Sequence, residues 1–192
     1  MIFPQPITGP FGTLEISVAH AADLPGVLRL FDDAVAWLNA RGVTGQWGTT
    51  PFSASPRSGP RFMGWIDAGA LFVARQDGRI VGTVALAAQP PAYAAHFWET
   101  FPATAYYLEA FATARDRAGE GIGGALLAWA EAYARQRGKA TIWLDCWADS
   151  RDLVAYYQRA GYTPVDTFSV GEWRGQLFHK ALEPDEAIST AV

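Results

Sequence analysis

The spacing of apolar positions along the chain switches several times between a period of two, typical of strands, and a period of about 3.6, typical of helices. Glycine and proline residues separate these stretches. Strand-like runs cover 13–18, 70–75, 79–88, 105–113, 141–147, 162–170 and 175–182. Helical spacing with recognisable end signals predicts helices over 23–41, 61–67, 122–137 and 151–160. This order of elements predicts a mixed α/β fold.

The chain has 192 residues, 50% of them hydrophobic, which is enough to bury the core of one ordinary domain. No internal repeat or low-complexity block interrupts it. We therefore expect an extended, proline-rich leader over 1–12, a single domain over 13–182 and a loose tail over 183–192.

Charge and cysteine content limit the partners and the cellular compartment that we expect for the protein. A net charge of -4 excludes a broad basic face, so we expect no nucleic-acid partner. The first residues lack the basic stretch of a secretory signal, and Pro90-Pro91 divides the apolar segment 80–98, so we expect neither export nor a membrane span. The single cysteine, Cys146, excludes an intrachain disulfide and fits a reducing compartment, which predicts a cytoplasmic protein.

The segment 115–124 joins a predicted strand to a predicted helix, and its last six residues include four glycines. Glycine lets backbone amides converge on one point, and the unpaired amides of a first helical turn attract anions together with the helix dipole. The pattern therefore predicts a phosphate site at this turn. A tight turn that merely needs glycine is the alternative.

Gly119, Gly121 and Gly124 also match the G-x-G-x-x-G pattern of dinucleotide-binding folds, with Asp145 near the place of their ribose-binding acid. The context argues against that fold. Ala114 to Ala118 separate the strand from the first glycine, and the chain after Asp145 is too short to complete a doubly wound sheet. The motifs of P-loop enzymes, serine hydrolases and zincins do not occur, so these classes have no support.

Two separate stretches resemble the GNAT superfamily of N-acetyltransferases. Phe111-Ala112-Thr113 followed by 118–127 is similar to the acetyl-CoA motif of that family, and 149–162 is similar to the tyrosine-bearing helix that follows it. The resemblance implies an α/β, GNAT-like (acyl-CoA N-acyltransferase) fold, with a mixed, mostly antiparallel central sheet flanked by helices on both faces. It also implies acetyl-CoA as cosubstrate and no metal.

The same resemblance implies which residues bind the cofactor. Backbone groups of Phe111, Ala112 and Thr113 would hold the pantetheine arm, and Ser150 would cap the next helix beside the cofactor. The diphosphate would lie against Ala118, Gly119, Glu120, Gly121, Ile122, Gly123 and Gly124. The chain departs from the family at three of these positions, where Gln or Arg, a basic residue and Asn are usual: Ala118, Glu120 and Ser150.

Transfer of an acetyl group to an amine needs a base for the amine and a proton for the departing thiolate. By the resemblance, Tyr157 would be the acid; the alternative is that it only packs, and Tyr156 is its neighbouring substitute. Glu109 is our candidate for the base, because it interrupts an apolar strand beside the cofactor motif. A carboxylate on a solvated face or paired with an arginine is the alternative. Asp145 is the second candidate for the base, or for an anion that binds the amine.

Aromatic residues in the turn-rich segment 42–60 are candidates for the acceptor pocket. Trp47 and Phe52 lie where this superfamily builds that pocket, and rings near a carboxylate suit a small cationic amine. The alternative is that these rings fill a core and a dimer contact. The three histidines have no metal-ligand spacing, so we expect no metal site.

These observations predict an acyltransferase that moves an acetyl group from acetyl-CoA to a primary amine of a small molecule by direct transfer. The alternative is a non-catalytic acyl-CoA-binding or sensing module. Edge strands in this architecture invite pairing between copies, so a homodimer is left open.

Overall fold

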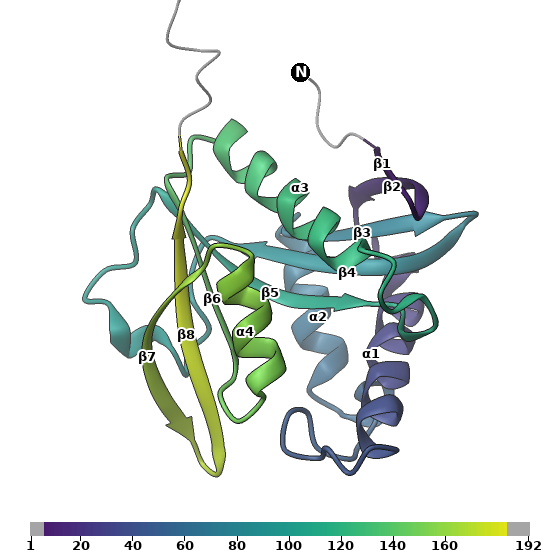
Figure 1. Cartoon of the computed structure of the whole chain (residues 1–192), viewed down its shortest axis with the longest axis horizontal. Coiled ribbons are helices and arrows are strands. Elements are labelled where there is room, and N and C mark those ends of the chain that lie inside the picture. The colour runs from purple at the N-terminus through teal and green to yellow at the C-terminus, as the bar shows by residue number, and fades with distance from the viewer. Residues whose placement is uncertain (1–5, 184–192) are drawn as a thin grey trace, which may run out of the picture. The chain divides into compact units, whose positions relative to one another are not determined.

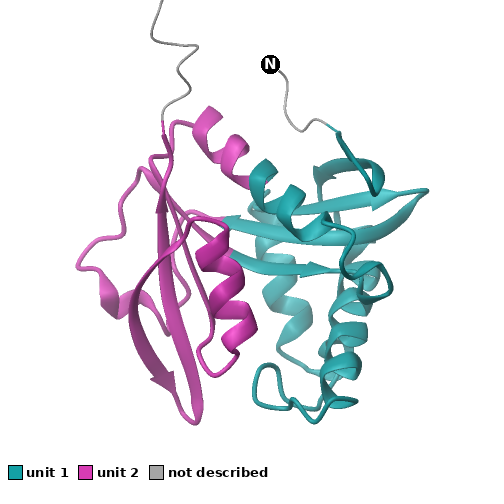
Figure 2. Ribbon diagram, in the orientation of Figure 1, with its two compact units in different colours: residues 1–86, 109–129 teal, residues 87–108, 130–192 magenta. Residues whose placement is uncertain are grey.

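The computed structural model describes residues 6–183, which form two compact units (Figure 2). The first unit holds the chain up to residue 86 together with 109–129, and the second holds 87–108 and the chain from 130 onward. Strand β5 (Ala105–Thr113) and helix α3 (Ile122–Gln136) each contribute to both units. The single domain predicted for 13–182 stays a prediction, and nearly all of the predicted tail lies outside the described residues.

The first unit contains an antiparallel meander (Figure 1). Its strands are β1 (Ile7–Gly9), β2 (Gly12–Val18), β3 (Leu71–Gln76) and β4 (Arg79–Ala87), paired in that order. The hairpin between β3 and β4 turns at Asp77-Gly78, where both residues have positive φ (50° and 76°) as a tight hairpin turn requires. The short strand β1 lies within the predicted leader.

Two helices of the first unit lie on one face of its strands, and α3 begins on the other face (Figure 1). These helices are α1 (Leu24–Asn39) and α2 (Ser58–Asp67), with 3-10 turns at Ala21–Asp23, Phe52–Ala54 and Arg115–Arg117. The helical spacing in α1 buries Val27, Leu30, Phe31, Ala34 and Val35. Helix α2 begins three residues earlier than its apolar pattern predicts, with Pro60 in its first turn.

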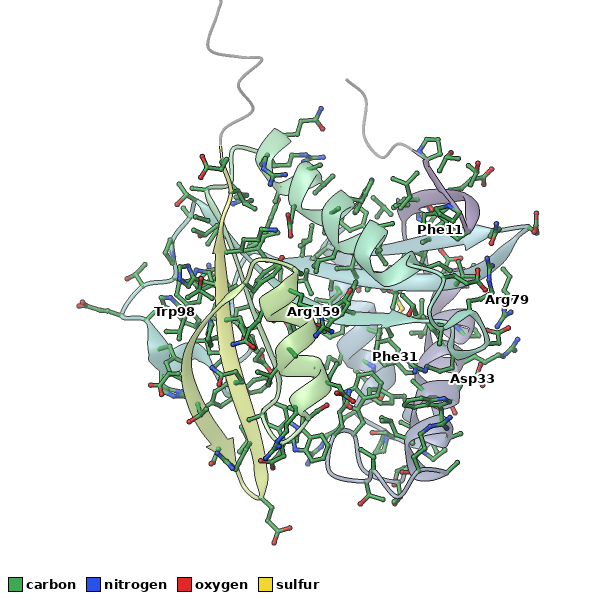
Figure 3. The ribbon with its side chains drawn as sticks, viewed as in Figure 1. Phe11, Phe31, Asp33, Arg79, Trp98 and Arg159 are labelled. Atoms are coloured by element: carbon green, nitrogen blue, oxygen red, sulfur yellow. The ribbon has the colours of Figure 1, made fainter. Side chains whose placement is uncertain are left out.

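The second unit contains the start of β5, then β6 (Thr141–Trp147), β8 (Trp173–Ala181) and β7 (Thr163–Val170). Strand β6 is parallel to β5 and antiparallel to β8, and β7 is antiparallel to β8. Helix α4 (Arg151–Arg159) lies over these strands (Figure 1). Aromatic side chains from the segment before β5, Trp98 among them (Figure 3), pack on buried residues of β5, β7 and β8.

The predicted fold class is confirmed: the elements form a mixed α/β fold whose sheet is mostly antiparallel. Helix α3 buries every residue expected to face inward: Ile122, Leu126, Trp129, Ala130 and Tyr133. No helix in the described part of the chain is both long and apolar enough to cross a membrane.

The regular period of two predicted over 105–113, with side chains alternating between the two faces of the sheet, does not hold along the whole of β5. Ala110 has a positive φ of 48°, which a non-glycine residue rarely adopts, and the paired register with β6 runs only from Ala105 to Leu108. The strand is therefore distorted beside Glu109, and the backbone from Glu109 to Thr113 lies outside the β5–β6 ladder.

Candidate active site

The glycine loop, residues 119–124, follows the 3-10 turn at Arg115–Arg117 in the first unit and includes the first three residues of helix α3. Gly119 and Gly121 both have φ of +88°, a conformation that side chains rarely tolerate. Apart from the adjoining backbone, a Cβ atom added at Gly119, Gly121 or Gly124 would meet no protein atom within 4 Å. These glycines are therefore not explained by tight packing within the protein, and a side chain at each would occupy open space beside the loop.

The start of helix α3 turns its first amides toward this loop. Its first intrahelical bond runs from the Ala125 N–H to the Gly121 carbonyl at 3.1 Å, so the amides of 122–124 have no intrahelical acceptor. Unpaired amides and the positive end of a helix dipole suit a diphosphate. The residues of the loop therefore fit the group that the sequence assigned to them, with the backbone rather than side chains as the donor.

The carboxylate of Glu120 is engaged by Arg117. The Arg117 guanidinium donates to both carboxylate oxygens of Glu120, at 2.8, 2.8 and 2.5 Å. It also donates to the Gln76 side chain and, at 3.2 Å, to the Phe11 carbonyl. The hydrogen bonds from Arg117 lower the pKa of Glu120, and those to Glu120 raise the pKa of Arg117. Arg117 therefore ties the glycine loop to β3 and to the turn after β1 while it neutralises Glu120.

Strand β5 carries the other residues predicted to hold the cofactor. Phe111 and Thr113 are half-buried and Ala112 is buried. Their backbone lies in the part of β5 beyond the printed register with β6, so the edge that faces away from β4 has no β6 ladder there. This placement is compatible with backbone contacts to a pantetheine arm.

Glu109 forms an ion pair with Arg61 of helix α2, also in the first unit. The Arg61 Nη2 donates to the Glu109 Oε2 at 2.7 Å. The exposed fraction of the Glu109 side chain is 8%, whereas that of Arg61 is 51%. The arginine pairing that the sequence left open as an alternative is therefore present, and it joins a mostly buried carboxylate to a half-exposed guanidinium.

The rings predicted to line the acceptor pocket form one aromatic cluster with α1 and α2. Phe31, labelled in Figure 3, contacts Trp47, Phe52 and Phe62 at centroid distances of 5.4, 4.9 and 5.0 Å. Trp65 extends the cluster, 5.1 Å from Phe62, and its ring lies 4.9 Å from the Arg61 Cζ. We call this aromatic cluster, together with Arg61 and Glu109, the acceptor wall. Trp47 and Phe52 are half-buried, so the acceptor wall still exposes apolar surface.

Tyr157 belongs to the second unit and is buried on the inner face of α4. Its ring contacts Tyr156, Tyr162 and Phe178 at 5.3, 6.0 and 5.8 Å. Burial raises the pKa of Tyr157 well above its ordinary value, so its hydroxyl stays protonated near neutral pH. The tyrosine therefore packs, as the alternative expected, and it also keeps the proton that an acid must have.

The helix that carries Tyr157 also holds Tyr156, and Ser150 directly precedes it. The buried hydroxyl of Tyr156 has no hydrogen-bond partner among the described residues, and burial raises its pKa. Ser150 caps α4, because its Oγ accepts a hydrogen bond from the Leu153 N–H at 3.3 Å. The predicted cap at Ser150 is thus present.

Asp145 on β6 accepts hydrogen bonds from two tyrosines of the second unit. The Tyr107 hydroxyl donates to its Oδ1 at 2.5 Å and the Tyr93 hydroxyl at 3.1 Å. Cys146 is buried, and its burial raises the pKa of the thiol to about 12. Asp145 is therefore part of a hydrogen-bonded group with two phenols, and the thiol beside it stays protonated and inert.

The predicted residues fall into two sets. Glu109, Trp47, Phe52, the strand 111–113 and residues 118–124 belong to the first unit, and Asp145, Ser150 and Tyr157 to the second. Sequence patterns did not select Arg61 or Tyr93. Arg61 lies 48 residues from Glu109, and no local pattern connects them. Tyr93 lies in a proline-rich segment, where its aromatic ring was the available signal.

The family model of the GNAT acetyltransferases matches residues 33–162 of the chain. The chain belongs to the GNAT family of acetyltransferases. The uncharacterized N-acetyltransferase YesJ of Bacillus subtilis (strain 168) is 30% identical to it over 141 residues, 73% of this chain and 76% of that protein. The predicted family and enzyme class, an N-acetyltransferase, are thereby confirmed.

Solved GNAT structures share its fold. An acetyltransferase of this family from Listeria monocytogenes 4b F2365 is 21% identical, with a TM-score of 0.73, over 93% of this chain and 100% of that chain. The protein yncA of Salmonella typhimurium, solved with its cofactor acetyl-CoA, is 16% identical, with a TM-score of 0.62, over 93% of this chain and 99% of that chain. No group of three or more metal-ligating side chains occurs within residues 6–183.

Proposed function

We propose that this GNAT enzyme transfers an acetyl group from acetyl-CoA directly to the primary amine of a small molecule. The observation that carries the proposal is the glycine loop at the start of α3, whose positive-φ glycines, open space and amides without an intrahelical acceptor suit an anion. The acetyl-CoA in the related yncA structure supports the identity of the cosubstrate. The acceptor wall, with its rings and carboxylate, supports a small cationic acceptor.

The chain's own residues would share the chemistry in the following way. Within 118–124 the N–H groups of Ala118 and Glu120 donate to the carbonyls of Arg115 and Arg117, so the amides of 122–124 are the main donors to the diphosphate. Backbone groups of 111–113 align the pantetheine arm. Glu109, or a water that it orients, takes a proton from the ammonium group of the acceptor. The amine nitrogen bonds to the carbonyl carbon of the thioester and loses its second proton to solvent. The carbon–sulfur bond breaks, and Tyr157 gives its proton to the departing thiolate and is reprotonated from solvent. Ser150 caps the helix that carries Tyr157.

Release of free CoA thiol, followed with a panel of small amines, tests this function. We expect steady release that needs both acetyl-CoA and an amine. Glu109→Gln should lower kcat by about 100-fold near neutral pH, since a positioned base contributes about that much. The exposed Glu15→Gln on β2 is the control and should keep full activity. Binding of acetyl-CoA without release for every amine would favour a non-catalytic binding module instead.

A cytoplasmic location and a homodimer both remain predictions. The buried, protonated Cys146 is compatible with a reducing compartment. Cell fractionation would test the location, and sedimentation of the purified enzyme over a range of concentrations would test the assembly.

A further inference from the structure

We infer that the acceptor amine carries a carboxylate, and that Arg61 binds it. The inference rests on the proposed function and deepens it by naming the substrate class: an amino acid, or a similar amino-carboxylate, with an apolar side chain. The feature that carries it is the ion pair between Arg61 and Glu109, which places opposite charges 2.7 Å apart within the acceptor wall.

The two charges match the two ends of a zwitterion. A guanidinium binds a carboxylate with paired N–H donors in a fixed plane, and Glu109 would take the ammonium group. Half of the Arg61 side chain is exposed, so a dissolved carboxylate can reach it.

Glu109 makes this exchange of ion-pair partners selective for acceptors that carry both an ammonium group and a carboxylate. Its side chain is only 8% exposed, and a mostly buried carboxylate is costly without a cation beside it. When an acceptor carboxylate draws Arg61 away, the acceptor's own ammonium group can take the vacated place beside Glu109, and the charge of the wall is unchanged. A simple amine brings an ammonium group but no carboxylate to draw Arg61 away, so Glu109 stays engaged by the arginine.

The aromatic part of the acceptor wall indicates the rest of the acceptor. The Arg61 guanidinium lies over Trp65, and ring contacts continue from Trp65 through Phe62 to Phe52 and Trp47. Phe52 and Trp47 are half-buried, so apolar surface extends away from the charged pair. An acceptor held by its ammonium and carboxylate groups at the pair can lay an apolar side chain along these rings.

Three acceptors that share a phenylethylamine core separate the contributions: phenylalanine, phenylalanine amide and 2-phenylethylamine. Their kcat/KM values are compared per concentration of neutral amine, so that differences in amine basicity cancel. We expect phenylalanine to be the best of the three by at least about tenfold, because the other two lack the carboxylate. A short peptide with phenylalanine at its N-terminus and a blocked C-terminus is the fourth substrate.

The variant Arg61→Met should lower kcat/KM for phenylalanine by about 30-fold. It should not lower kcat/KM for 2-phenylethylamine, because removal of the guanidinium leaves Glu109 open to a simple ammonium group. Arg61→Lys keeps a charge without the planar fork and should recover part of the loss. Arg57→Met, an exposed arginine one turn earlier, is the matched control and should change neither substrate. The double variant Arg61→Met/Glu109→Gln removes both charges and reports by its melting temperature whether the wall still folds.

Each result points one way. Equal losses for all substrates in Arg61→Met, in protein that melts normally, would show that Arg61 only supports Glu109 and would overturn the inference. Equal or better turnover of 2-phenylethylamine or of the peptide in the wild type would do the same while the proposed N-acetyltransferase activity stood. No thiol release with any amine would remove the proposed function and this inference together.

Discussion

The glycine loop and the surroundings of Tyr157 differ in what they present to a ligand: the loop presents exposed backbone, and Tyr157 is a buried side chain. The loop presents backbone amides and open space, with its one carboxylate neutralised by Arg117. Tyr157 lies among rings, and burial holds its proton in place. A site built from backbone tolerates changes of side chain except where a glycine is replaced. A site built into a core couples every substitution to stability, so its tests need variants that keep the packing.

The largest expected effect comes from Tyr157→Phe, which removes the hydroxyl and keeps the ring. If Tyr157 is the acid, kcat should fall by about 100-fold or more, with little change in melting temperature. Tyr156→Phe is the matched control on the same helix. Its hydroxyl is buried without a partner among the described residues, so its loss should preserve activity and leave stability equal or higher. Thiol release and thermal unfolding measure both, and full activity in Tyr157→Phe would remove the acid assignment.

The next effect is expected at the loop. Gly121→Val places a side chain in the open space beside the amides and strains a backbone with φ of +88°. We expect coenzyme A affinity to fall by at least about 100-fold, since two or more charge-assisted bonds are lost. Gly138→Val has a similar φ of +72° and similar open space at the other end of α3, so it should cost similar stability and keep the affinity. Calorimetric titration distinguishes the two, and equal affinities would count against a diphosphate at the loop.

A smaller effect is expected at Asp145, whose carboxylate is hydrogen-bonded to two tyrosines of the second unit. Asp145→Asn keeps the shape but removes the charge that accepts bonds from Tyr107 and Tyr93. Stability should fall by about 1–3 kcal/mol, as for a hydrogen bond to a charged group. Urea unfolding measures the loss, with Asp149→Asn as an exposed control on the same connection. A normal midpoint with lost turnover would instead favour Asp145 as the base.

The smallest effect is expected from Glu120→Gln. Removing a negative charge beside a bound diphosphate should strengthen coenzyme A binding by about threefold at low salt, and the gain should shrink as salt rises. The hydrogen bonds from Arg117 lower the pKa of Glu120. The wild-type carboxylate is therefore ionised at neutral pH, and it loses its charge only when the pH falls below the range in which carboxylates ordinarily titrate. The difference between wild type and variant should therefore be constant near neutral pH. A loss of affinity would show that Glu120 positions Arg117 for the loop.

Sequence patterns predicted what depends on near neighbours. The buried face of α3, the turn at Asp77-Gly78 and the glycine loop each follow from residues a few positions apart, where helical period, turn chemistry and positive φ act locally. The family followed from two such stretches. By itself, then, the sequence determined most of the elements and the fold class, and it predicted the place of an anion site.

Only the tertiary structure decided which side chains meet. The positive φ of Ala110 could not be predicted, because alternation assumes a regular strand. Arg61 and Glu109 are 48 residues apart, and Tyr93 and Asp145 are 52 apart. Pairs at such separations come together only when whole elements pack, because the free energy that aligns them is shared over the core and leaves no local pattern. The charge of the acceptor wall, on which the proposed substrate class depends, was for this reason visible only in the folded chain.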